Sequence, residues 1–205
     1  MNQEASRCVN ATVGRTARVV ISGILLSVAG AGLLALWRPS VDAQAERKPL
    51  VTALQVSGAR GQPKSWRGVI PGVSSRADAI KLLGQPARMV KNSWETLEYP
   101  SGIEGLPNGV RVEKGVVTVV GLVVTSIQKV VLNEFVTQLG PAWRITFSRF
   151  LDGAKTYVFA TDGVTVVADG ETGRVYLVQL YTPMSIEAYM STLGRDLPLT
   201  NPFIK

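Results

Sequence analysis

The sequence predicts an α+β fold made of two tandem helix-plus-antiparallel-meander units. The first observation is a repeated phrase: LGQPARM occupies residues 83–89, and LGPAWRI occupies residues 139–145, 56 positions later. The second is that each phrase ends a helical pattern and is followed by strand-like stretches with turn residues between them. The third is a set of Asp-Gly steps in the second half, which are strong hairpin signals. The same order at a near-constant offset indicates internal duplication.

The first expected helix begins near Ser74 or Ser75, either of which can cap its free N–H groups, with Asp78 at the spacing of a capping box. Gly84 is expected to end this helix, because glycine adopts the left-handed turn after a last carbonyl at low cost. Pro86 then prevents the helix from resuming. Strand-like stretches follow at residues 87–90, 94–100 and 109–124.

The second half repeats this order. Its expected helix runs over residues 126–139, with Ser126 as the candidate cap and Gly140 as the end. Strand-like stretches follow at residues 142–151, 155–161 and 163–182. Asp-Gly steps at 152–153, 162–163 and 169–170 interrupt them and predict an antiparallel meander. A shorter echo at residues 185–194 predicts a C-terminal helix.

The N-terminal part of the chain predicts a membrane segment. Residues 19–37 contain no charged residue over 19 positions, and a helix of that length spans a bilayer core of roughly 30 Å. Three arginines precede it, so the N terminus is expected in the cytoplasm and the rest of the chain outside. An Ala-x-Ala pattern ends at Ala45, which keeps both a retained anchor and a cleaved signal peptide open.

The predicted organisation follows from these patterns. It comprises a cytoplasmic N-region (1–18), a signal peptide or transmembrane anchor (19–38), a linker (39–65), a first unit (66–125), a second unit (126–182) and a C-terminal helix with its tail (183–205). The linker is inferred from a composition rich in Pro, Gly, Ala and Ser without a sustained period, apart from the strand-like LVTALQV.

Composition restricts the chemistry that the chain can perform. There is no histidine and a single cysteine, Cys8, which excludes Ser-His and Cys-His catalytic pairs and an internal disulfide. Asp152, Asp162, Asp169 and Glu171 form a carboxylate-rich region, but three of them precede a glycine, so we interpret them as turn formers. We therefore expect no catalytic residue, no metal site and no cofactor.

The formal net charge of +7 raises the question of a nucleic-acid partner. The Lys and Arg residues are dispersed along the chain and do not gather at the density of a phosphate-binding patch. The sequence therefore predicts a mildly basic solvated surface and no nucleic-acid partner.

Aromatic and charged side chains on the predicted strands are the better candidates for binding. Strand side chains alternate between two faces, and a face with aromatic residues and Arg is typical of a protein interface. The candidate binding residues are Trp94, Glu98, Tyr99, Trp143, Arg149, Tyr157, Arg174 and Tyr176. Trp143 is singled out because the first copy has Ala87 at the matching place.

The stretch IPGVSSRADAIKLLGQPARM, followed by WETLEYP, resembles the signature of the SmpA/OmlA-type family of outer-membrane-assembly lipoproteins. The matching positions are Gly72, Ser74, Leu83, Gly84, Pro86, Trp94 and Tyr99. Two such units in tandem are similar in layout to β-lactamase inhibitory protein. The resemblance implies two units sharing one curved sheet, here preceded by an N-terminal hydrophobic helix, and a binding function.

The expected function is a non-catalytic binding or assembly module outside the cytoplasm. It is held by residues 19–37 or secreted after cleavage near Ala45, and it binds a protein partner in the cell envelope or outside the cell through its antiparallel sheet. An inhibitor of a secreted enzyme is the alternative. A glycan- or ligand-binding envelope protein is a further alternative, and a carboxylate- or calcium-dependent enzyme stays open behind these.

Overall fold

The computed structural model describes residues 49–148 and 151–202. Its main strands are β4 (Arg88–Lys91), β5 (Glu95–Tyr99), β6 (Asn108–Glu113), β7 (Val116–Val123), β8 (Arg144–Phe147), β9 (Ala154–Phe159), β10 (Val164–Asp169) and β11 (Val175–Tyr181). Three shorter strands are β1 (Pro49–Val51), β2 (Val56–Ser57) and β3 (Ser65–Trp66). The α-helices are α1 (Arg76–Leu83), α2 (Leu132–Leu139) and α3 (Ile186–Ser191), and the 3-10 helices are η3 (Thr52–Leu54), η4 (Ser126–Gln128) and η5 (Ala160–Asp162).

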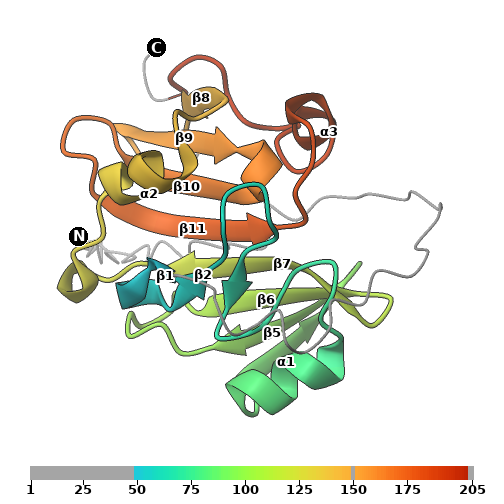
Figure 1. The fold of residues 1–205 in the computed structure, drawn as a ribbon. Coiled ribbons are helices and arrows are strands. Elements are labelled where there is room, and N and C mark those ends of the chain that lie inside the picture. The colour runs from blue at the N-terminus through green and yellow to red at the C-terminus, as the bar shows by residue number, and fades with distance from the viewer. Residues whose placement is uncertain (1–48, 149–150, 203–205) are drawn as a thin grey trace, which may run out of the picture.

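The main strands form one eight-stranded antiparallel sheet in the order β4-β5-β6-β7-β11-β10-β9-β8 (Figure 1). The predicted α+β class, with a large antiparallel sheet and few helices, is confirmed. Between residues 49 and 202, no helix has the length and apolar character that a membrane crossing requires. The predicted anchor at residues 19–37 and the cleavage pattern at Ala45 lie outside the described residues.

Helix α1 begins and ends where the sequence predicts. The Ser75 hydroxyl accepts a hydrogen bond from the Asp78 N–H at 3.1 Å, and the Asp78 carboxylate accepts one from the Ser75 N–H at 2.9 Å. The Asp78 carboxylate also accepts from the Ser75 hydroxyl at 2.8 Å, and the hydrogen bonds from the Ser75 N–H and hydroxyl lower the pKa of Asp78, which keeps the capping carboxylate charged. Gly84 ends the helix with a φ of 86°. The sequence is sufficient to predict where this helix begins and ends, because its capping hydrogen bonds join residues close in the chain.

Helix α2 begins at Leu132, so the prediction of Ser126 as its cap is wrong. Ser126 starts the separate helix η4, and Lys129 after it adopts a left-handed φ of 49° that breaks the helical path. The carbonyl of Val130 accepts a hydrogen bond from the Val175 N–H at 3.1 Å, which ties this stretch to the large sheet. The predicted end at Gly140 is confirmed, with a φ of 82°.

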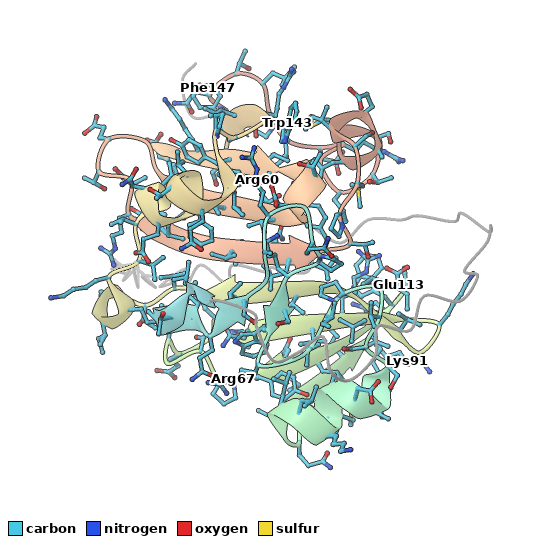
Figure 2. All side chains as sticks on the ribbon, viewed as in Figure 1. Arg60, Arg67, Lys91, Glu113, Trp143 and Phe147 are labelled. Carbon is cyan, nitrogen blue, oxygen red and sulfur yellow. The ribbon has the colours of Figure 1, made fainter. Side chains whose placement is uncertain are left out.

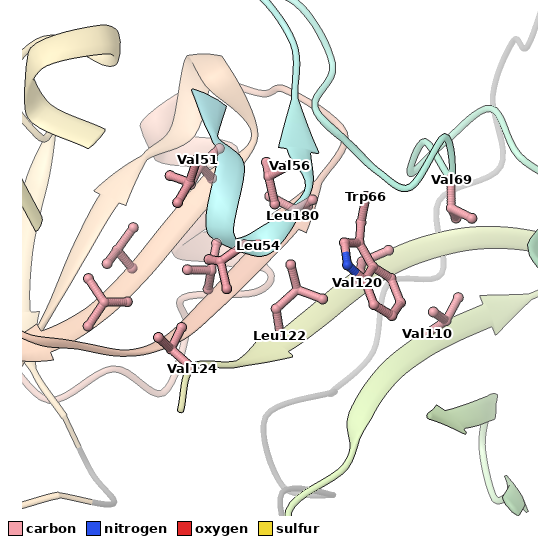
Figure 3. Packing of buried hydrophobic residues seen from close by; sticks show 14 of the residues in the cluster. Val51, Leu54, Val56, Trp66, Val69, Val110, Val120, Leu122, Val124 and Leu180 are labelled. Carbon is pink, nitrogen blue, oxygen red and sulfur yellow. The ribbon is translucent and has the colours of Figure 1, made fainter. Parts of the chain in front are cut away.

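Part of the predicted linker, residues 39–65, lies within the described structure, and the strand-like LVTALQV in it contributes to β1 and β2. Residues 49–66 form a three-stranded sheet, β1-β2-β3, in place of a linker. Val51, Leu54 and Val56 are buried in the same cluster as Leu122 of β7 and Leu180 of β11 (Figure 3). The small sheet therefore covers the pair of strands at the centre of the large sheet.

The large sheet has apolar clusters on both faces. Val120 and Leu180 pair across β7 and β11, and both belong to the main cluster with Phe135 of α2. Their neighbours Val119 and Tyr181 also pair, point the opposite way, and belong to a second cluster with residues of α3. The small sheet, α1 and α2 thus contribute to one core, and α3 covers the other face of the second half.

Three hydroxyl groups connect α3 to the sheet. The Thr165 hydroxyl lies 3.2 Å from the Tyr181 hydroxyl and 3.1 Å from that of Tyr189. The two tyrosine ring centroids are 5.2 Å apart. Burial raises the pKa of Tyr189 to about 12 and raises that of Tyr181 well above its usual range. The folded state therefore favours the neutral form of both tyrosines.

This network predicts loss of stability in alkali. A tyrosine whose pKa is higher in the folded than in the unfolded chain stabilises the fold fully below pH about 10, and that contribution is lost as the pH rises toward about 12. Urea unfolding between these pH values should show a falling free energy of unfolding. The Tyr189→Phe variant serves as the control. Over the same pH range its free energy of unfolding should fall by about 2 kcal/mol less than that of the unsubstituted protein. An unchanged slope in the variant would contradict the assignment.

Candidate binding surface

Trp143 is the most exposed aromatic residue among the candidates that the structure describes. Its N–H donates to the carbonyl of Val158 at 2.8 Å, which fixes its backbone against β9. Its indole Nε1 donates to the Thr161 hydroxyl at 3.0 Å, while 61% of the residue remains exposed. The ring is thus held in place with its apolar surface in solvent, as a preformed binding contact requires.

Ile145 extends this apolar surface along β8. It lies opposite Tyr157 of β9 and is 54% exposed, because β8 is the last strand of the sheet. Arg144, between Trp143 and Ile145, is exposed and lies opposite Val158. Since paired residues share a sheet face, Arg144 and Ile145 lie on opposite faces.

Arg60 brings a positive charge to the same place from a distant part of the chain. It belongs to the loop between β2 and β3, which Figure 2 draws over the half of the sheet that carries Trp143. A Cβ atom on Gly140 would lie 3.1 Å from a terminal nitrogen of the Arg60 guanidinium, so the cation sits at the end of α2. A helix C-terminus favours a cation there.

A buried ion pair holds this loop against the second half. Lys64 Nζ lies 3.2 Å from a carboxylate oxygen of Asp162, and both side chains are almost fully buried. The same ammonium donates to the carbonyls of Ala59 and Gln62, each at 2.7 Å. The same Asp162 oxygen also accepts from the Gly61 N–H at 2.6 Å. The Lys64–Asp162 ion pair therefore positions the loop that carries Arg60. It also positions Thr161, which precedes Asp162 in the chain.

The interpretation of Asp162 as a turn former is therefore incomplete. The Asp162-Gly163 step does connect β9 to β10, as predicted, but the Asp162 carboxylate is buried against the Lys64 ammonium. Asp152 and Asp169 fit the prediction better. Asp169 accepts from the Thr172 and Glu171 N–H groups at 2.7 and 3.1 Å, and these hydrogen bonds lower its pKa. No three His, Cys, Asp or Glu side chains in the described part of the chain are grouped to hold a metal ion.

Two of the candidate binding residues lie in or against the core. Tyr99 is 5% exposed and packs edge-on against Trp66, with ring centroids 6.2 Å apart. Tyr157 is half-buried against the main cluster, opposite Ile145. Alternation along a strand does not show which of its two faces meets the core.

Trp94 and Glu98 lie in the first half, far along the sheet from Trp143. The guanidinium carbon of Arg111 lies 3.9 Å from the centroid of a Trp94 ring, and Arg111 also pairs with Glu113. Glu98 is half-buried, 3.8 Å from Arg88. Burial lowers the pKa of Arg111, and Glu113 opposes that shift. These side chains already have partners, in two separate groups: Trp94 with Arg111 and Glu113, and Glu98 with Arg88.

The remaining candidates lie near the turn that precedes β11. The guanidinium carbon of exposed Arg174 lies 5.6 Å from the ring centroid of half-buried Tyr176. The Tyr176 hydroxyl donates to Asp169 at 3.4 Å. Arg149 lies outside the described residues. The candidates therefore do not form one site. We call the surface formed by Trp143, Arg144, Ile145 and Arg60 the β8 surface.

A hollow lies at the other end of the sheet. Its volume is about 420 Å³, and it is lined mainly by the β5–β6 loop at residues 100–107 together with Arg88 and Glu98. Glu98 is the ion-pair partner of Arg88. The hollow contains none of the residues of the β8 surface.

Comparisons with known proteins give little further information. The sequence matches no family model, and it matches no curated protein. Among solved structures, a DUF4309 family protein, YjgB, from Bacillus subtilis is similar over 65% of this chain and 93% of its own. The sequence identity is 18% and the TM-score is 0.44. A likeness of this size indicates neither function nor partner.

Proposed function

We propose that the protein is a non-catalytic binding module that acts outside the cytoplasm, anchored by residues 19–37 or secreted after cleavage near Ala45, and that its β8 surface holds a protein partner. The observation that carries this proposal is Trp143, a large aromatic side chain that is fixed by a hydrogen bond and still mostly exposed. Trp and Arg are among the residue types that contribute most to the binding energy of protein interfaces, and both are exposed on the β8 surface.

We further propose that the fold contains two tandem units of the SmpA/OmlA type, sharing one sheet as in the layout of β-lactamase inhibitory protein. Equivalent contacts in the two halves support this. Ser75 bridges to Val116 in the first half, and Val131 bridges to Arg174 in the second. Glu134 accepts from the Val131 N–H at 3.2 Å, as Asp78 does from Ser75. The β8 surface is then a place where the second unit differs from the first.

Site-specific photo-cross-linking tests the binding function. A photoreactive amino acid at Ile145 of the full-length chain, expressed in its own cells, should give a cross-link to one protein of the cell envelope. The matched control is the same substitution at Ile127, which is 88% exposed but lies on η4. Adding Trp143→Ser should abolish the cross-link from position 145. Labelling of lipid alone, or equal labelling from both positions, would contradict a protein partner.

A further inference from the structure

We propose that the β8 surface recognises an extended segment of its partner, added as a strand to the outer edge of β8, in which apolar residues alternate with acidic ones. The inference rests on the proposed binding function and specifies the partner's chemistry. Three observations carry it: an open backbone edge at Ile145, the division of Arg144 and Ile145 between the two faces, and the positive charge of this edge.

The backbone of β8 leaves one residue available for pairing. The Ser148 N–H donates inward to Ala154 of β9 at 3.0 Å, whereas the Phe147 N–H donates outward to the carbonyl of Pro198 at 3.0 Å. N–H directions alternate along a strand, so the Ile145 N–H and C=O point outward like those of Phe147. Among the described residues, no backbone hydrogen bond outside the strand ladders involves the Ile145 N–H. The outer edge is therefore closed at Phe147 and open at Ile145.

Side-chain alternation then specifies what the added strand must carry. The residue opposite Ile145 would meet the exposed apolar surface of Ile145 and Trp143 and should itself be apolar. Its neighbour, opposite Arg144, would point to the other face and meet a guanidinium. A carboxylate there forms a charge-assisted hydrogen bond with the guanidinium. An apolar–acidic alternation satisfies both contacts at once.

The charges around the surface favour an acidic partner over a second copy of the chain. Arg60 and Arg144 are exposed, and neither forms an ion pair with a described residue. The nearby carboxylate of Asp162 is already neutralised by Lys64. Two copies joined edge to edge through β8 would place these cations against each other, which is unfavourable. A segment with carboxylates is attracted to the same edge.

Short synthetic peptides test this inference with the full-length protein in detergent micelles. The probe is a labelled, capped peptide that alternates valine with glutamate, and its counterpart has lysine in place of each glutamate. Fluorescence polarisation should show binding of the glutamate peptide at least about tenfold tighter than that of the lysine peptide. Arg144→Glu should reverse this preference. The matched control is Lys91→Glu on β4, the opposite edge of the sheet, which should leave it unchanged.

Backbone methylation separates strand addition from simple charge attraction. In an added antiparallel strand, the valine opposite Ile145 directs its N–H toward β8, so N-methylation of the valines should weaken binding by about tenfold or more. N-methylation of the glutamates, whose N–H groups point away, should leave binding unchanged. Equal effects of the two methylations, or no preference for the acidic peptide, would overturn the inference. If Ile145 still cross-links to an envelope protein in that case, the proposed binding function stands and only the strand addition is wrong.

Discussion

Replacing Asp162 by alanine is expected to lower the free energy of unfolding by about 3–5 kcal/mol, because removing one member of a buried ion pair leaves the other charge uncompensated. Here the remaining charge is Lys64, which is fully buried. The Gly61 N–H would lose its acceptor as well. Urea denaturation followed by tryptophan fluorescence measures the change.

The matched control for this prediction is Asp152→Ala, because Asp152 belongs to the same type of Asp-Gly step but is exposed. Among the described residues, its carboxylate accepts a hydrogen bond only from the N–H of the next residue, Gly153, at 2.8 Å. We expect a loss of less than about 1 kcal/mol for this variant. Similar losses in both variants would mean that Asp162 acts only as a turn former and that the ion pair contributes little.

The second large effect is expected at Gly163, the residue that follows Asp162. Its φ is 65°, and a Cβ atom would stand 2.1 Å from the carbonyl oxygen of Tyr181. Gly163→Ala therefore combines left-handed strain with a backbone clash, and each costs about 1–3 kcal/mol. We expect a total loss of about 3–5 kcal/mol in the free energy of unfolding.

Gly153→Ala isolates the strain from the clash. Gly153 has a similar φ of 72°, but nothing lies within 4 Å of the position of its Cβ. This variant should lose only about 1–2 kcal/mol, the cost of the left-handed conformation. Equal losses at the two glycines would show that the turn between β9 and β10 adjusts to the Tyr181 carbonyl without cost. That result would contradict the expected clash.

Features fixed by neighbouring residues could be predicted from the sequence. Ser75 with Asp78, and the glycines at 84 and 140, act through hydrogen bonds or backbone angles within a few residues. The Asp-Gly steps likewise marked the turns between the last strands of the sheet. These signals are local, so a single sequence contains them in full.

Features fixed by distant residues could not be predicted. Lys64 and Asp162 are 98 positions apart, and nothing near either residue distinguishes this Asp-Gly step from the other two. Strands β2 and β3 have two residues each, too few for an alternation to be recognised. Their burial depends on strands β7 and β11, which are far along the chain.

The candidate site shows the same division. The difference between the two halves indicates Trp143 as a candidate, and the structure places it at the surface. Tyr99 came from the same kind of strand pattern and lies in the core. The difference depends on strand order: Trp143 adjoins the last strand of the sheet, whereas β5 lies inside it between β4 and β6. Strand order depends on pairing between distant segments, which periodicity does not report.

The place of the small sheet has a mechanical consequence. A tension applied through Pro49 would reach the two residue pairs of β1 with β2, Pro49 with Ser57 and Val51 with Val56, before it reached the large sheet. Those pairs lie over the junction of β7 and β11, away from the outer edge at β8. A pull from the N-terminal side would therefore load this short hairpin, and the loop with Arg60 that follows it, before it loaded the large sheet.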